Sequence, residues 1–269
     1  MIEFIHISDT HFGPSKDMEI RGSIPYDRNS ALVEAINSLN FTPDFLVHTG
    51  DIVNDPDDDA YQLAEEVLSQ LRAPIHYVSG NHDDAASTRK FMTSGANVTL
   101  EGVGDKLAYS FQMGDGVTGV VFDAWVPPEM GPHGFLSQSQ VMAFEKLLQA
   151  SDDRFALFLH YPMVPIGSPW IDEHLLVENG EAVHSFLTGY SERITGVFFG
   201  HLHRGLQILR DGILYSGVSS PVCHFTAGPN ETTCEFDSNC ALAFNHVTIS
   251  GHGTMVKEYS IPFQPVGRV

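Results

Sequence analysis

Cysteine and long apolar runs are both scarce in this sequence. It contains 3 cysteines, Cys223, Cys234 and Cys240, whose odd number and late clustering predict free thiols instead of a disulfide framework. Their spacing includes no CxxC pair, which argues against a zinc knuckle. No apolar run approaches the roughly 20 residues that a transmembrane helix needs. We therefore expect a protein without disulfide bonds and without membrane spans.

Basic residues are also few. The chain has 14 Lys and Arg against 34 Asp and Glu, a formal net charge of −20. Duplex nucleic acid and anionic membranes are bound by basic patches, so the sequence predicts neither as a partner. Met1 leads directly into a strand-like segment, without the basic and apolar regions of a secretory signal. These features favour a cytoplasmic protein.

The length and the pattern of apolar residues predict a single α/β domain. A chain of 269 residues with 42% apolar composition can form one large unit. We expect that unit at residues 1–260 and a C-terminal tail at 261–269. Three apolar strands are predicted in the first eighty residues, at 3–7, 44–49 and 75–78, and an amphipathic helix is predicted between each strand and the next. This βαβαβ order predicts a parallel sheet.

The remainder of the chain predicts a second sheet. Residues 107–113 and 117–122 read as a hairpin, and apolar strands follow at 155–159 and 195–199. A Pro- and Gly-rich stretch at 161–172 reads as a loop able to cover a cleft. Further elements are expected as helices at 137–149 and 179–187 and as short strands of the second sheet near 208 and at 213–216, 242–249 and 254–259.

Polar motifs follow five of the apolar runs. They are Asp9-Thr10-His11, Gly50-Asp51, Gly80-Asn81-His82-Asp83, His160, and Gly200-His201-Leu202-His203. In open α/β sheets the loops beyond the carboxyl ends of the strands share one edge, so these side chains could converge. Residues two apart in an extended segment point the same way, so Asp9 with His11, and His201 with His203, can each present two groups to one cavity.

The residue types in these motifs are those of a metal centre. Asp, His and Asn without Cys suit divalent manganese, iron or zinc. Seven such ligands exceed the needs of one ion but fit two ions that share a carboxylate, about 3.5–4 Å apart. Singly, each motif has an ordinary structural explanation: Asp9 could cap a turn, His160 could be a core histidine, and His201 could lie on a surface turn. Their recurrence at successive strand ends favours the metal site.

The ordered motifs resemble those of the calcineurin-like metallophosphoesterases, from residue 9 to residue 203. Within that superfamily, Gly80-Asn81-His82-Asp83-Asp84, His160-Tyr161-Pro162 and the stretches at 167–172 and 178–180 are similar to class III cyclic-nucleotide phosphodiesterases and a bacterial glycerophosphodiesterase. The resemblance implies a four-layer α/β/β/α sandwich of two mixed β-sheets flanked by helices. It also implies a dinuclear metal site.

The resemblance assigns roles by position. One metal would be held by Asp9, His11, Asp51 and His203, and the second by Asp51, Asn81, His160 and His201. Asp51 would bridge the two ions. A hydroxide held by both metals would attack phosphorus, while His82 stabilises the developing charge or protonates the leaving alkoxide. Asp83 is expected to orient His82.

We therefore expect a metal-dependent phosphodiesterase of small diesters, with 3′,5′-cyclic nucleotides such as cyclic AMP ahead of glycerophosphodiesters. A broad-specificity phosphomonoesterase is the further enzymatic alternative, and an interaction module on the same fold is the non-enzymatic one. Trp170, Asn179 and His224 are predicted to contact substrate together with Asn81 and His82. The late apolar strands could also support a homo-oligomer.

Overall fold

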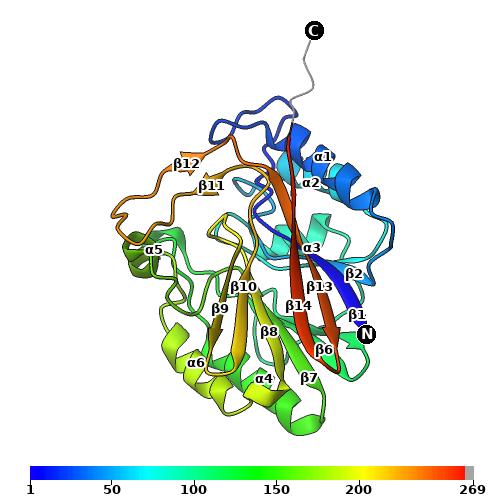
Figure 1. The fold of residues 1–269 in the computed structure, drawn as a ribbon, viewed down its shortest axis with the longest axis vertical. Coiled ribbons are helices and arrows are strands. Elements are labelled where there is room, and N and C mark those ends of the chain that lie inside the picture. Colours follow the sequence, from blue (N-terminus) through cyan, green and yellow to red (C-terminus); the bar gives the residue numbers. More distant parts are fainter. Residues whose placement is uncertain (264–269) are drawn as a thin grey trace.

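Two large β-sheets form the centre of the protein, with helices on both outer sides (Figure 1). The structure is a computed structural model that describes residues 1–263. The first sheet has the strand order β14-β13-β1-β2-β3, and the second has the order β4-β5-β6-β7-β8-β10-β9. β11 and β12 form a small separate hairpin. Within the described residues, no helix is long and apolar enough to cross a membrane.

The elements have the following bounds. The first sheet contains β1 (Ile2–Ile7), β2 (Phe45–His48), β3 (Ile75–Tyr77), β13 (Leu242–Ser250) and β14 (Gly253–Ile261). The second contains β4 (Val98–Thr99), β5 (Tyr109–Gly114), β6 (Val117–Val121), β7 (Arg154–Phe158), β8 (Ile194–Phe199), β9 (Leu206–Arg210) and β10 (Ile213–Gly217). The hairpin consists of β11 (His224–Phe225) and β12 (Phe236–Asp237). The helices are α1 (Pro25–Asn37), α2 (Asp58–Leu68), α3 (Ala85–Phe91), α4 (Gln138–Ala150), α5 (Pro169–His174) and α6 (Gly180–Thr188), with short 3-10 helices at Pro128–Met130 and Ser191–Arg193.

Each of the two sheets contains a set of parallel strands. β1, β2 and β3 run parallel with α1 and α2 as crossovers, as the sequence predicts. α1 begins with Pro25, whose missing N–H costs nothing in a first helical turn, and Asp57 caps α2 by accepting from the N–H of Asp59. β6, β7, β8 and β10 are parallel in the second sheet.

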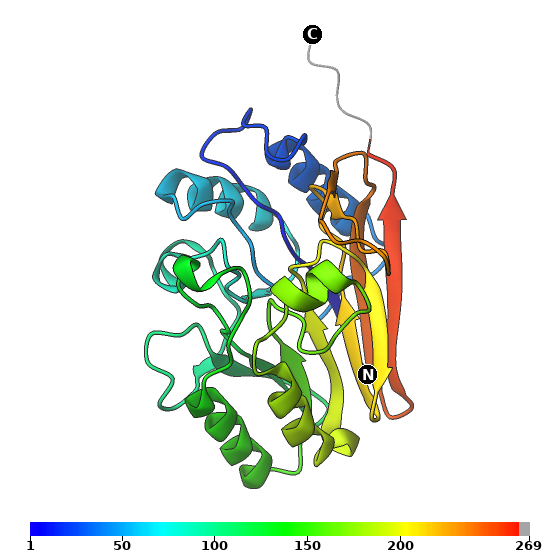
Figure 2. The same cartoon turned by 90° about the vertical axis from the view of Figure 1, so that its left-hand side faces the viewer.

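Three apolar cores separate four layers. One core, with Leu32 and Leu46, lies between α1, α2 and the first sheet. A second, with Phe4 and Phe158, lies between the two sheets, and a third, with Phe144, lies between the second sheet and α4 and α6. In Figures 1 and 2 the two groups of helices lie on opposite sides of the sheets. The predicted four-layer α/β/β/α fold is therefore confirmed.

One assignment to a sheet was wrong. The strands predicted at 242–249 and 254–259 belong to the first sheet, where β13 pairs antiparallel with β1. Both faces of β13 are buried: Leu242 and Phe244 face the helices, and Val247 and Ile249 face the second sheet. An apolar run with two buried faces does not reveal from its pattern which sheet it joins.

Two smaller differences concern loops and the chain end. The predicted loop at 161–172 contains the start of α5, which begins at Pro169 and includes Trp170. The predicted division into a domain at 1–260 and a tail at 261–269 falls at the end of β14, which closes at Ile261. Beyond residue 263 the predicted tail lies outside the described residues.

Candidate metal centre

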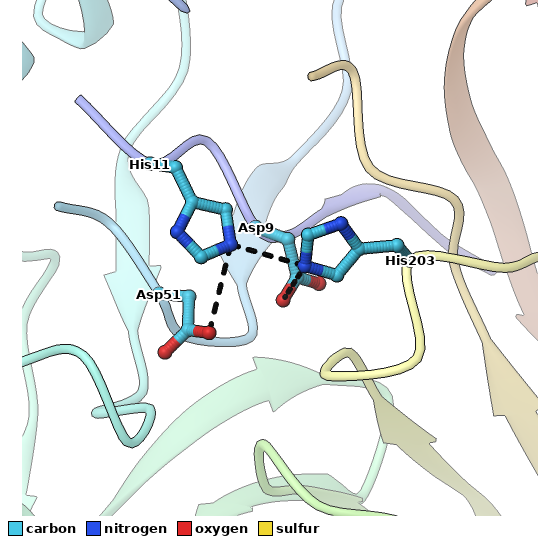
Figure 3. Close-up of side chains that lie close together, drawn as sticks. All are labelled: Asp9, His11, Asp51 and His203. Atoms are coloured by element: carbon cyan, nitrogen blue, oxygen red, sulfur yellow. Dashed lines mark hydrogen bonds and ion pairs between the residues drawn. The ribbon is translucent and has the colours of Figure 1, made fainter. Parts of the chain in front are cut away.

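The loops after β1, β2, β7 and β8 bring buried aspartates and histidines together at one edge of the two sheets. Two groups of side chains have ligand atoms that all lie within 4.8 Å of one another. The first group, shown in Figure 3, consists of Asp9, His11, Asp51 and His203, and the second consists of Asp51, His160 and His201. Asp51 belongs to both groups. This arrangement suits two metal ions that share one carboxylate.

The first group is built around two imidazole rings. Nε2 of His11 lies 3.0 Å from Nε2 of His203 and 3.7 Å from Oδ2 of Asp51. Oδ1 of Asp9 lies 3.5 Å from Nε2 of His203. Figure 3 shows the four side chains pointing toward a common point from three loops, with Asp9 and His11 on the same one. The separations are those of atoms that could share a central cation, since each would need to lie about 2.0–2.2 Å from it.

The second group lies on the other side of Asp51. Nε2 of His160 lies 3.3 Å from Oδ2 of Asp51 and 3.0 Å from Nδ1 of His201. The amide oxygen of Asn81 lies 3.2 Å from the same His160 nitrogen. The structure thus brings all seven predicted ligand positions to one centre, with Asn81 beside the second group.

The backbone at this centre is unusual. Asp9, His11, Asp51, His201 and His203 all have positive φ, between 44° and 66°. Non-glycine residues rarely adopt this conformation, which costs of order 1 kcal/mol or more each and clusters at functional sites. Each of these residues follows the end of a buried strand, so the chain turns sharply as the side chain enters the centre. The sequence contains no signal for this conformation.

The donor set fits divalent ions, as the histidine hydrogen bonds show. Nδ1 of His203 donates to the carbonyl of Cys223 (2.9 Å), and Nδ1 of His160 donates to the carbonyl of Thr49 (2.7 Å). A carbonyl accepts and does not donate, so Nδ1 carries a proton in both rings and Nε2 faces the cluster; in the neutral His203 ring this Nε2 holds the lone pair. A metal-bound histidine typically donates a hydrogen bond in this way from the ring nitrogen that does not contact the metal.

The charged groups at the centre shift one another's pKa values. Burial raises the pKa of Asp9 to about 7, and Asp51 adds to that rise. Burial alone would raise the pKa of Asp51 too, but His160, His82 and His11 hold it well below its ordinary range. Burial would lower the pKa of His160, yet Asp51 and Asp9 raise it to about 9. A buried pair of carboxylates is favourable only with positive charge beside it, which divalent ions would supply.

Burial disfavours the charged form of the other histidines in the two groups. Burial lowers the pKa values of His11, His201 and His203 well below the ordinary histidine value, although Asp51 opposes this in each case. Neutral imidazole is the form that binds metal. The rings are therefore held in the protonation state that a metal site needs.

His82 lies at the mouth of the centre, beside a cavity. Its Nδ1 donates to the carbonyl of Asn54 (2.6 Å), and its backbone N–H donates to Oδ1 of Asp51 (3.0 Å). The first bond leaves Nε2 free, and this atom lies 3.4 Å from Nη2 of Arg21. This differs from the prediction that Asp83 orients His82.

Asp83 has a different use. Its buried carboxylate accepts from the backbone N–H groups of Ile52 (3.0 Å), Val53 (3.2 Å) and Gly80 (2.9 Å). Because these bonds join the loops after β2 and β3, Asp83 holds the two loops that carry Asp51 and Asn81. Burial and the Asp51 charge raise its pKa to about 6.

A cavity of about 690 Å³ opens next to His82. Its lining includes Asn81, His82, Trp125 and the acidic residues Asp55 and Asp84. Trp125 was not among the predicted contact residues. It follows β6, and its position after an apolar strand is the signal that could have identified it.

Of the five residues predicted to contact substrate, Trp170, Asn179 and His224 are not part of this cavity lining. Trp170 packs in α5 beside His174, with ring centroids 5.2 Å apart. The Asn179 side chain accepts from the N–H of Leu136 and donates to its carbonyl, so both of its polar ends are used within the fold. His224 lies in β11, next to the Cys223 carbonyl that holds His203. Their contacts with substrate stay predictions.

Comparison with known proteins identifies related sequences. The sequence model of the calcineurin-like phosphoesterase family matches residues 2–205. A glycerophosphodiester phosphodiesterase of Enterobacter lignolyticus is 31% identical over 202 residues, covering 74% of this chain and 69% of the relative. A cAMP/cGMP dual specificity phosphodiesterase of Mycobacterium tuberculosis is 32% identical over 228 residues, covering 82% of this chain and 67% of the relative.

A solved structure supports the fold independently. The Plasmodium protein described as GAP50, the anchor in the inner membrane complex, aligns with a TM-score of 0.57 at 14% identity. The alignment covers 98% of this chain and 89% of that structure. At this identity the likeness concerns the fold alone.

Proposed function

The chain belongs to the calcineurin-like phosphoesterase family, and from that premise we propose that it hydrolyses 3′,5′-cyclic AMP or a closely similar small phosphodiester. One observation carries the proposal. Two groups of Asp and His side chains share Asp51 and lie beside His82, whose Nε2 would face a bound phosphoryl group. Such a centre is built to bind two divalent ions and, through them, a phosphoryl group.

Asp9, His11, Asp51 and His203 would hold one ion, and Asp51, Asn81, His160 and His201 would hold the other. The donors suit manganese, iron or zinc. Bound there, such ions would supply Lewis-acid chemistry, activating water and neutralising charge on phosphoryl oxygens.

His82 is the proposed acid for the leaving group. Its Nδ1 proton is held by the carbonyl of Asn54, so a second proton would sit on Nε2, on the side that faces the centre and the cavity. Transfer of that proton to the departing alkoxide would avoid release of a poor leaving group. Asp83 would contribute by holding the loops around the centre, not by contacting His82.

The cavity supports a small organic substituent on the phosphate. Its volume of about 690 Å³ is in the range of small-ligand sites, and the Trp125 ring offers a surface for a nucleobase. The acidic residues in the lining, Asp55 and Asp84, disfavour a substrate with further phosphates. A monoanionic diester with one neutral group suits this cavity.

The same lining favours a second candidate, a glycerophosphodiester with a cationic alcohol. A quaternary ammonium such as choline is attracted by carboxylates and by the face of an aromatic ring. Asp55, Asp84 and Trp125 would supply both. Glycerophosphocholine is therefore the comparison substrate.

The remaining alternatives carry less weight. A phosphomonoesterase would use the same centre, whereas an interaction module would have no use for a full set of ligands and a histidine such as His82. Cytoplasmic location and homo-oligomer formation stay predictions. Cell fractionation and light scattering of the purified protein would test them.

The first experiment measures hydrolysis of bis(p-nitrophenyl) phosphate by metal-stripped protein before and after addition of Mn²⁺. We expect a rise from background to clear turnover, and none in an Asp51→Asn variant, which lacks the shared carboxylate charge. Comparison of kcat/KM on cyclic AMP and glycerophosphocholine then decides the substrate. Much faster turnover of glycerophosphocholine would replace the first candidate by the second. No hydrolysis of any diester by protein carrying two ions would contradict both.

A further inference from the structure

Arg21 lies at the tip of a tight turn in the loop between β1 and α1. The backbone N–H of Ile20 donates to the carbonyl of Ser23 (2.7 Å), and the N–H of Ser23 donates to the carbonyl of Ile20 (3.0 Å). The two residues between them, Arg21 and Gly22, have φ values of 52° and 81°. Positive φ at both central residues is the property of a type I′ turn, which strongly prefers Asn-Gly.

Arginine is an unfavourable choice for the first position of this turn. A long side chain in the left-handed conformation costs of order 1 kcal/mol, whereas Asn tolerates it well. Gly22 is required at the second position, since a Cβ there would lie 2.8 Å from Oγ of Ser238. Strain of this kind is a reason to look for a function of the side chain.

The turn directs the guanidinium at the metal centre. Nη1 of Arg21 lies 3.1 Å from Nε2 of His11 and 3.5 Å from Nε2 of His203. Nη2 lies 3.4 Å from Nε2 of His82. The guanidinium therefore spans the gap between the first group of ligands and His82.

Two phenylalanines hold the guanidinium in place. Phe225 and Phe236 are cross-strand partners in the β11–β12 hairpin, with ring centroids 5.0 Å apart. Cζ of Arg21 lies 5.9 Å from the Phe225 centroid and 5.0 Å from the Phe236 centroid. Phe225 also stacks on His203 at 4.1 Å. Cation–π contact is the interaction that these rings offer to an arginine.

The guanidinium has no carboxylate partner in the described part of the chain, where its polar contacts are imidazole nitrogens and the side chain of Cys223. Ions bound by His11 and His203 would use the lone pairs that face Arg21, which would leave its Nη1 group without these two imidazole acceptors. A cation beside two divalent ions is repelled unless an anion lies between them. The planar fork of arginine matches two oxygens of a phosphoryl group.

We propose that Arg21 is a substrate-binding residue of this centre, which binds the non-bridging oxygens of the phosphoryl group opposite the metal ions. This inference rests on the proposed function, because it takes the bound anion to be the phosphate of the substrate. It explains why a strained turn carries arginine and why an aromatic hairpin supports its side chain.

The test uses Arg21→Asn, which places the preferred Asn-Gly pair in the turn while removing the guanidinium. Wild-type and variant proteins are loaded with Mn²⁺, their metal content is counted by mass spectrometry, and inorganic phosphate is titrated by calorimetry. We expect two ions per chain in both proteins, an equal or higher Tm in the variant, and phosphate binding weakened about 10- to 100-fold. Arg21→Lys keeps the positive charge but lacks the planar guanidinium, so we expect its phosphate affinity to lie between those of the wild type and Arg21→Asn.

Arg72→Asn serves as the matched control, since Arg72 is exposed and borders a separate pocket near residue 40. Unchanged phosphate affinity in Arg21→Asn would overturn the proposal. Loss of metal from that variant would overturn it as well, because Arg21 would then support the centre and not the substrate. Wild-type protein that binds phosphate through Arg21 but cleaves no diester would contradict the proposed function and leave the anion site standing.

Discussion

The imidazole ring of His82 is oriented by the hydrogen bond from its Nδ1 to the carbonyl of Asn54, which leaves Nε2 on the side of Arg21 and the centre. We predict that His82→Ala lowers kcat/KM on an unactivated diester about 10²- to 10⁴-fold, the usual contribution of a positioned acid. Because p-nitrophenolate leaves without a proton, the loss on bis(p-nitrophenyl) phosphate should be much smaller. Steady-state kinetics on both substrates checks this.

Metal content separates that role from a ligand role. His82→Ala should retain both ions, and the exposed His252→Ala should resemble wild type in every respect. Equal losses on the two substrates, with metal retained, would argue against proton donation by His82.

The sequence placed Asp83 next to His82 but could not predict what the carboxylate contacts. Neighbours in sequence after a strand can point to opposite sides of a loop, and here Asp83 turns inward to three backbone N–H groups while His82 faces the cavity. Such a side chain–backbone bond depends on where a second loop passes. Only the folded structure fixes that position.

At the scale of the elements, the loop after β3 must pass very close to the loop after β2. A Cβ on Gly80 would lie 2.1 Å from Oδ1 and 2.5 Å from the backbone N of Asp51. We predict that Gly80→Ala displaces the shared carboxylate and lowers metal content from two ions per chain toward none. Diesterase activity should fall with it, as mass spectrometry and kinetics would measure.

A glycine with open surroundings provides the comparison. Gly251 lies in the turn between β13 and β14, where a Cβ would meet no atom of the described residues within 4 Å and where φ is not positive. Gly251→Ala should therefore retain both ions and full activity. Full metal occupancy in Gly80→Ala would show that the two loops can separate without loss of the centre.

The parallel strands and the polar residues that follow them could be predicted because both are local patterns. Apolar runs in the sequence predicted β1, β2, β3, β7 and β8. The loops that follow parallel strands meet at the carboxyl edge of the sheet, whatever sequence lies between the strands. The sheet to which β13 belongs is a long-range property, since both of its faces are buried. Period-two patterning carries no information about such a choice.

The proposed role of Arg21 could not be predicted from the sequence for a related reason. A lone arginine before a glycine in a loop has no spacing that points to a site, and its aromatic neighbours Phe225 and Phe236 lie some two hundred residues later. The positive φ values at the metal-facing residues were equally hidden, because aspartate and histidine at strand ends are compatible with ordinary turns.

For the whole molecule, the core between the sheets contains a histidine. The His76 ring stacks on Phe111 and is 5% exposed, and burial lowers its pKa to about 4. The unfolded chain takes up this proton near pH 6.5, so the stabilisation is present above that pH and is lost as pH falls toward 4. A shift of this size corresponds to about 3 kcal/mol of unfolding free energy.

Urea unfolding of metal-free protein between pH 7 and pH 4 measures this effect without interference from metal release. We predict that His76→Leu, although less stable at pH 7, loses less stability over the same range than wild type. Parallel pH curves for the two proteins would show that His76 does not contribute to acid unfolding.

The metal centre also joins the two halves of the fold. Asp9, His11 and Asp51 follow strands of the first sheet, and His160 and His203 follow strands of the second, so bound ions would link the sheets. An ion present at about 100 times its dissociation constant stabilises the folded state by about 2.7 kcal/mol, and two would raise Tm by roughly 10–20 °C in a domain of this size. Calorimetry in EDTA and in Mn²⁺ tests this. We expect the shift to persist in His82→Ala and to shrink in Asp51→Asn, whose carboxylate both ions would need. An unchanged Tm in wild-type protein shown to carry two ions would mean that the sheets are held together by their apolar core alone.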